Sequence, residues 1–124
     1  MLLITNVTIL LAATSHVYVH YKYMARDEKN RFDWDQDNIG HVAKHKVTPE
    51  EVEQVLSNDP LFIETRIDLR SGEERILELG HTNAGRVLFV AWMVRDGFVR
   101  PITAYPANRK TRADYYKRKI DEKT

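Results

Sequence analysis

The sequence predicts an α+β domain in which two N-terminal helices precede a four-stranded antiparallel meander and a basic C-terminal helix. Three observations support this prediction. Two capped amphipathic segments lie before residue 60, the hydrophobic period becomes alternating between residues 61 and 104, and short turn signals separate the alternating segments. Because such short connections permit only antiparallel neighbours, the strands should form a meander.

Two helices are expected between residues 35 and 57. Asp35 is the N-cap of the first helix, and Asp37 lies near the positive end of its dipole. The second helix begins with a capping box, with Thr48 as the N-cap, Pro49 as the first helical residue and Glu51 as the returning acid. The apolar residues expected on the buried stripes are Ile39, Val42 and Ala43 in the first helix and Val52, Val55 and Leu56 in the second.

The four strands are expected at residues 61–65, 75–80, 87–94 and 98–104, with turn signals at 70–72, 83–85 and 96–97. The third strand is almost wholly apolar, so it should be central and covered on at least one face. Pro101 cannot donate a ladder hydrogen bond and belongs at an edge or a bulge. Trp34 and Trp92 are expected in the core. His81, which lies next to a turn, is expected to face solvent.

The segment at residues 100–119 is the most basic part of the chain, with seven Arg and Lys residues and a single acid. Asn108 caps its helix, in which Ala113, Tyr116 and Ile120 lie on one stripe. Tyrosines are interleaved with the cations, and this combination suits RNA because cations neutralise phosphates and rings stack on unpaired bases. The alternative is a solvated helix with snorkelling basic side chains.

The 124-residue chain contains 43% hydrophobic residues, which indicates one globular domain at most. It has no Cys, which excludes thiolate zinc sites, disulfides and a Cys nucleophile and is compatible with a cytoplasmic protein. Residues 1–23 are a doubtful N-terminal extension, because their apolar part is too short to span a bilayer and lacks the basic start of a secretory signal. Met24 is therefore a candidate translation start, leaving a single domain at residues 24–124 and no membrane partner.

Several short motifs, in order along residues 32–119, resemble the BrnT toxin family. The residues that carry this resemblance are Phe32-Asp-Trp-Asp35, Asn38, Lys44-His45, Gly72-Glu-Glu-Arg75, Leu79-Gly80, Gly85-Arg-Val-Leu-Phe-Val90, Val99-Arg-Pro-Ile-Thr-Ala104 and Tyr116 on the basic helix. The resemblance implies a RelE-like fold and a metal-independent endoribonuclease toxin of a type II toxin-antitoxin pair. Such a toxin blocks translation by cleaving RNA, needs no cofactor, is neutralised by a BrnA-type antitoxin, and meets DNA only indirectly through that antitoxin.

The chain departs from the family pattern at the end of the last strand. Members commonly carry an Arg after the Ser/Thr-Ala pair, whereas this chain has Tyr105 followed by Pro106. The loss of a cation there weakens the expectation of strong nuclease activity. The alternative interpretation is a catalytically weak or inactive BrnT-like module that binds RNA or protein, and the blandest one is a domain whose basic helix only confers solubility.

Metal-free RNA cleavage requires a base for the 2′-hydroxyl proton, cations for the charge that gathers on phosphorus, and an acid for the 5′-oxygen. Arg suits the second task because its planar fork grips phosphate oxygens, although Arg75 could instead form a surface ion pair near Glu73 and Glu74. The imidazole of His45 could act as acid or base, or could merely complement a helix dipole. The candidate catalytic residues are Arg75, Arg109, His45 and Tyr105, and the candidate RNA-binding residues are Lys44, Lys110, Arg112 and Tyr116.

A metal site is not expected. His41 and His45 lie four residues apart, but Val42 replaces the glutamate that a zinc-protease helix requires and no third ligand is evident. The nuclease hypothesis therefore depends on the guanidinium groups gathering in one concave place where they can hold a ribose-phosphate chain.

Overall fold

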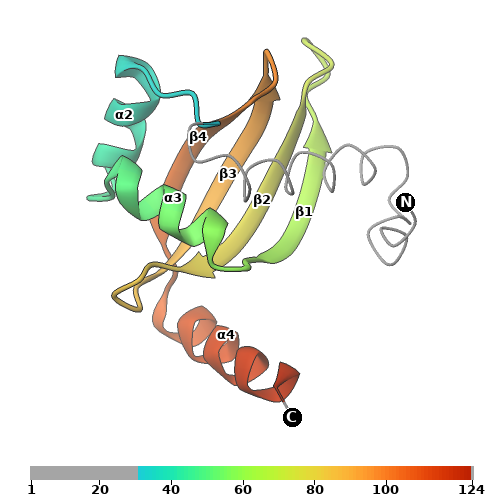
Figure 1. Ribbon diagram of the computed structural model, residues 1–124. Helices are drawn as coiled ribbons and strands as arrows, with labels where there is room; N and C mark the ends of the chain where they lie inside the picture. Colours follow the sequence, from blue (N-terminus) through green and yellow to red (C-terminus); the bar gives the residue numbers. More distant parts are fainter. Residues whose placement is uncertain (1–30, 124) are drawn as a thin grey trace.

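The computed structural model describes residues 31–123, and its strands pair antiparallel in the order β1-β2-β3-β4. The elements are α2 (Gln36–Ala43), α3 (Pro49–Ser57), β1 (Leu61–Ile67), β2 (Glu74–His81), β3 (Val87–Arg95), β4 (Phe98–Pro106) and α4 (Arg109–Glu122). Figure 1 shows α2 and α3 on one face of the sheet and α4 beyond the end of the strands. The predicted α+β meander is confirmed.

The expected extension at residues 1–23 and the candidate start at Met24 lie outside the described residues. No helix in the described part of the chain is long and apolar enough to cross a membrane.

The two N-terminal helices begin at the predicted caps. The Asp35 carboxylate accepts from the backbone N–H groups of Asp37 and Asn38, and the Thr48 hydroxyl accepts from that of Glu51. The buried stripe of α3 is confirmed, but that of α2 is wrong: Ile39 is 41% exposed and Ala43 is also exposed. The side chains that α2 buries are Asn38 and Val42.

The Asn38 amide explains this rotation of α2. Its side chain is 3% exposed, and its Nδ2 donates to the carbonyls of Asp33 and Pro101, both at 2.9 Å. Its Oδ1 accepts from the backbone N–H of Asp35 at 2.8 Å. A buried amide is stable only when it is hydrogen-bonded, so these bonds fix Asn38 toward β4 and leave Ile39 on the outer side.

The core lies between the sheet and the helices α2 and α3. Leu88, Val90 and Trp92 alternate along β3 and pack with the valines of both helices. Trp92 is 2% exposed, and its indole N–H donates to Glu78 at 3.0 Å, which satisfies a donor that burial would otherwise penalise. On β2, a Cβ added at Gly80 would lie 2.9 Å from Val55 Cγ1, so α3 approaches the strand too closely for any side chain there.

The helix α4 docks through Tyr115 rather than through the stripe at 113, 116 and 120. Tyr115 is 2% exposed and packs with residues at the end of the sheet, namely Leu79, Val87 and Ala107. Tyr116 and Ile120 are 37% and 63% exposed. The apolar spacing on α4 therefore marks a face on which the described residues leave Ala113 and Ile120 largely uncovered, while Tyr116 also contacts Gly85.

A hydrogen bond joins Tyr115 to β2. Its hydroxyl lies 2.7 Å from Nδ1 of His81, which is half-buried rather than facing solvent as expected. Burial raises the pKa of Tyr115 to about 12, so the phenol keeps its proton and can donate it. Burial, and next the positive charges of Lys119 and Lys123, lower the pKa of His81, so its ring is neutral and can accept.

The β2–β3 hairpin at residues 82–86 connects helices on both sides of it. Arg86 Nη1 lies 2.9 Å from Glu51 Oε1 on α3, where the two side chains form an ion pair. The hydroxyl of Tyr116 on α4 donates to the carbonyl of Gly85. The hairpin is thus held by α3 and α4 at once.

We expect the substitution Asn38→Ala to lower the free energy of unfolding by about 2–3 kcal/mol, because it leaves the Pro101 carbonyl buried without its donor and removes the return bond of the capping box to the Asp35 backbone N–H. Urea denaturation followed by circular dichroism measures this change. The control Gln36→Ala, at an exposed position of the same helix, should change it by less than about 0.5 kcal/mol. Equal losses in the two variants would contradict this account of α2.

The lowered pKa of His81 makes stability depend on pH. Below its ordinary value of 6.5 the unfolded chain takes up a proton before the folded chain does. The stabilisation by neutral His81 is therefore complete above pH 6.5 and is lost as the pH falls toward the lower folded pKa. In the variant His81→Gln, which keeps an acceptor for Tyr115, the free energy of unfolding should fall less between pH 6.5 and about pH 5. Parallel pH profiles for the two proteins would show that His81 has no such role.

Candidate functional site

A hollow of about 350 Å³ lies on the face of the sheet opposite α2 and α3. Side chains alternate along a strand, so residues between the core positions of β2, β3 and β4 point to this second face. The residues that line the hollow are Glu64, Arg66, Arg75, Ile76, Leu77, Ala91 and Tyr105. Its floor is apolar and its rim is charged, which suits a ligand with both a flat apolar part and an anionic part.

Two arginines stand next to each other on this rim. Arg66 and Arg75 are direct partners in the β1–β2 ladder, so their side chains leave the same face. Each has one carboxylate: Arg66 Nε lies 2.8 Å from Glu64, and Arg75 Nη2 lies 3.3 Å from Asp68. The two arginine side chains are 78% and 46% exposed, so both guanidiniums remain accessible to an anion. Like charges at opposed positions repel unless an anion lies between them, and a phosphate would serve.

The ion-pair alternative for Arg75 holds with a different partner from those expected. The carboxylate beside Arg75 belongs to Asp68. Glu73 instead pairs with Arg95 at 3.5 Å, and Glu74 accepts from the Thr65 hydroxyl at 2.9 Å. An ion pair as exposed as that of Arg75 and Asp68 contributes at most about 1 kcal/mol, so it leaves Arg75 available to a stronger anionic partner.

Tyr105 closes the hollow on the side of β4. Its ring stacks on Phe89 at 5.3 Å between centroids and meets the His45 ring at 5.9 Å. Tyr105 is 36% exposed, so part of the ring and its hydroxyl can contact a ligand. Arg75 and Tyr105 thus line one hollow, and His45, in the connection from α2 to α3, flanks it through Tyr105.

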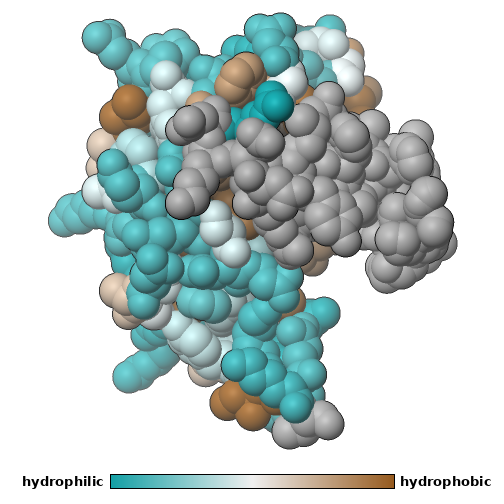
Figure 2. Space-filling view, viewed as in Figure 1, coloured by the Kyte–Doolittle hydropathy of each residue, from teal (hydrophilic) through white to brown (hydrophobic). Residues whose placement is uncertain are grey.

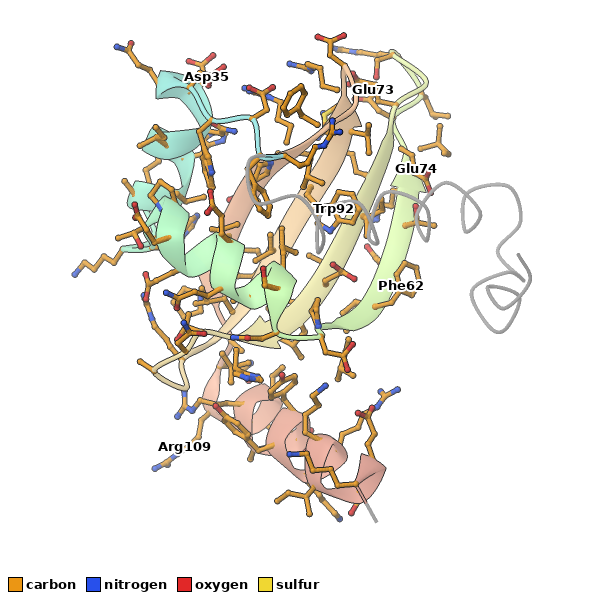
Figure 3. The ribbon with its side chains drawn as sticks, in the orientation of Figure 1. Asp35, Phe62, Glu73, Glu74, Trp92 and Arg109 are labelled. Carbon is orange, nitrogen blue, oxygen red and sulfur yellow. The ribbon has the colours of Figure 1, made fainter. Side chains whose placement is uncertain are left out.

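The predicted residues on α4 do not reach this hollow. Figure 3 shows Arg109 beyond one end of the sheet and Glu73, close to Arg75 in sequence, at the other end. β4 passes the chain to α4 at the end where β2 finishes, so Arg75 at the start of β2 is a full strand away. The expectation that all the guanidinium groups gather in one concave place is therefore not met for Arg109 and Arg112.

The side chains of α4 have their own surroundings. Lys110 donates to Asp114 at 2.9 Å, and this hydrogen bond raises the pKa of Lys110. Within residues 31–123, no carboxylate pairs with the side chain of Arg109 or Arg112. The positive charge of these two residues is thus open to a polyanion at the end of the sheet.

Lys44 belongs to a second hollow, of about 520 Å³, on the outer side of α2. Its described lining residues are Gln36, Asp37, Gly40, His41 and Lys44. They come from one helix and its C-cap, so the hollow has no second wall among the described residues. Within the part of the chain that the structure describes, no cluster of His, Asp and Glu could hold a metal ion.

Two residues of the rim, Arg66 and Glu64, are missing from the sequence-based set. The first strand was expected to end at residue 65, whereas β1 continues to Ile67. In a strand extended by two residues, the pairing of Arg66 with Arg75 follows from the turn signal at 70–72. A prediction that extended the first strand to residue 67 would therefore have placed Arg66 opposite Arg75.

A comparison with known families shows the family of this chain. Residues 34–111 match the family described as ribonuclease toxin, BrnT, of type II toxin-antitoxin system. No curated protein matches the chain. The matched span covers more than half of the chain and runs from Trp34 to the first turn of α4, so it includes every residue that lines the hollow. The chain belongs to the BrnT family of ribonuclease toxins of type II toxin-antitoxin systems.

Proposed function

We propose that this protein is a metal-independent endoribonuclease toxin that cleaves RNA in the hollow lined by Arg75 and Tyr105. Family membership supplies the ribonuclease class and an antitoxin partner, and we assign that partner to the BrnA type. The observation that carries the proposal is the pair of accessible guanidiniums, Arg66 and Arg75, beside an apolar floor. The cleaved RNA is required for translation, so the free toxin arrests growth.

Arg75 is the main phosphate ligand in this proposal. Attack of the 2′-hydroxyl on the adjacent phosphorus gathers negative charge on the non-bridging oxygens, and a fixed guanidinium stabilises that charge. Arg66, directly opposite on β1, adds a second guanidinium to the same phosphate. Because Tyr105 stands where the family commonly has an Arg, these two residues neutralise the phosphate without a third cation.

Tyr105 and His45 take the remaining roles. The exposed edge of Tyr105 offers a hydroxyl that donates to a phosphate oxygen, while Phe89 holds its ring in place. His45, in contact with that ring, takes the proton of the 2′-hydroxyl and returns it to the leaving 5′-oxygen, because an imidazole nitrogen can accept and then donate a proton. Neither role needs a metal ion.

The other cations hold RNA outside the hollow. Arg109 and Arg112 lie at the end of the sheet, so in this proposal they bind phosphates that flank the cleaved one. Lys44 and Lys110 share this function, and Tyr116 adds a ring on which a base can stack. Their contribution is affinity rather than chemistry, and it decreases as salt rises.

A catalytically weak or inactive module that binds RNA or a protein is the second candidate. Tyr105 favours it, because an uncharged phenol stacked on Phe89 replaces a cation at the strand end. Cleavage assays on purified protein distinguish the two candidates, since the module would bind RNA and leave it intact.

Induced expression without the antitoxin should arrest growth, and Arg75→Ala should relieve that arrest. We expect cleavage of a single-stranded RNA to fall about 10²- to 10³-fold in this variant, because a main transition-state cation is lost. Arg109→Ala should weaken RNA binding at low salt with a smaller effect on the single-turnover rate. Arg118→Ala, at an exposed position of α4, is the matched control and should behave as the wild type. Full toxicity of folded Arg75→Ala would show that the assignment of the hollow is wrong.

Cleavage should persist in excess EDTA, because the proposed proton transfers and charge stabilisation use side chains alone. A substrate with a 2′-deoxy sugar at the cleavage point should bind but remain intact, since it lacks the attacking hydroxyl. The measurement is gel analysis of end-labelled RNA and of its deoxy-substituted counterpart. Activity that disappears with EDTA and returns with a divalent cation would contradict metal independence.

A further inference from the structure

The helix α4 carries an apolar stripe that is separate from the face buried by Tyr115, although the hydroxyl of Tyr116 in this stripe reaches the Gly85 carbonyl. Ala113, Tyr116 and Ile120 follow helical spacing, and all three are exposed. Ile120 is 63% exposed and Tyr116 is 37% exposed. Figure 2 shows an apolar patch on α4 surrounded by hydrophilic side chains. Ile120 lies in the last turn of this charged helix, and the described residues leave most of its aliphatic side chain uncovered.

The charges of α4 are arranged around this stripe. With about 100° of rotation per residue in an α-helix, the cations that fall within about 80° of the stripe are Arg109, Lys110, Arg112, Lys117 and Lys123. The acids Asp114, Asp121 and Glu122 lie about 100° or more away. Of the five cations, Lys110 alone pairs with a carboxylate in residues 31–123. The stripe therefore has cations on both sides and no acid beside it.

We propose that this stripe is the docking site for an acidic amphipathic segment of the antitoxin. This inference rests on the proposed function in one respect, because the proposed function supplies the antitoxin as the partner that binds the stripe. An apolar centre with a polar rim is the usual anatomy of a protein interface, and an exposed helix stripe is one of the recurring surfaces for peptide recognition. The cations on both flanks select acids on both flanks of the partner's apolar face.

Two other occupants fit these observations less well. A second copy of the chain would bring the flanking cations of two α4 helices together, and α4 holds six Arg and Lys residues against three acids. Like charges across such a contact would oppose association. RNA would use the cations and the Tyr116 ring, but an exposed Ile at the centre offers RNA neither charge nor a stacking surface.

This docking site gives a specific mode of inhibition. Acids of the antitoxin would neutralise Arg109 and Arg112, the same cations that hold flanking RNA phosphates in the proposed function. The antitoxin would thus compete with RNA at α4 without filling the hollow itself. Charge attraction would also speed the encounter, and this effect would weaken as salt rises.

The test measures binding of the purified full-length protein to its cognate antitoxin by isothermal titration calorimetry. Ile120→Ser should weaken binding about tenfold or more, because the one long aliphatic side chain of the stripe is removed. Leu69→Ser is the matched control: Leu69 is 95% exposed, lies in the β1–β2 turn and should leave affinity unchanged. Lys117→Glu should weaken binding at low salt and less at high salt. RNA cleavage by Ile120→Ser and Leu69→Ser should equal that of the wild type.

Three outcomes would overturn the proposal. Wild-type affinity in folded Ile120→Ser would show that the stripe does not hold the antitoxin. Loss of RNA cleavage in Ile120→Ser with antitoxin affinity unchanged would assign the stripe to RNA. A wild-type dimer that Ile120→Ser converts to a monomer, again with affinity unchanged, would assign it to a second copy. If the wild type cleaves no RNA, the proposed nuclease function fails, while the calorimetric comparison still decides where the antitoxin binds.

Discussion

The burial of Leu88, Val90 and Trp92 beneath α2 and α3 determines which face of the sheet remains accessible. Once alternate residues of the central strand are committed to the core, their neighbours must point to the opposite face, where the described helices leave an accessible hollow. Arg66 and Arg75 reach that hollow by the same alternation along β1 and β2. A shift of one residue in the strand pairing would place the arginine side chains in the core and expose the core side chains to water.

The parts of the fold that the sequence predicted well are those determined by neighbours in the chain. The capping box at Thr48 and Glu51 needs only the residues themselves, and the short turns fix the antiparallel order of the strands. The orientation of α2 depends instead on the Pro101 carbonyl, 63 residues away from Asn38, which no local pattern reveals. For α4, aliphatic spacing indicated one face, whereas the aromatic Tyr115 and its bond to His81 determine the buried one.

The candidate site shows the same division. The residue types needed to hold phosphate could be recognised from the chain alone, and the hollow includes Arg75 and Tyr105 from that set. Which of these residues lie together could not be recognised from the chain alone, because this depends on the end of the sheet at which each strand begins or ends. Arg109 and Arg112 are near Tyr105 in sequence but lie past the sheet's end, while Arg66, absent from the set, faces Arg75 across the ladder.

The hairpin between β2 and β3 joins α4 to the rest of the domain, and this has a mechanical consequence. The Tyr116 hydroxyl of α4 donates a hydrogen bond to the Gly85 carbonyl, and Glu51 of α3 forms an ion pair with Arg86. A displacement of α4 would therefore be transmitted to α3 through the neighbouring hairpin residues Gly85 and Arg86. Hairpin tips are ordinarily among the most mobile parts of a fold, but this tip is bonded to both α3 and α4, so it adds to the packing of Tyr115 in fixing the position of the basic helix.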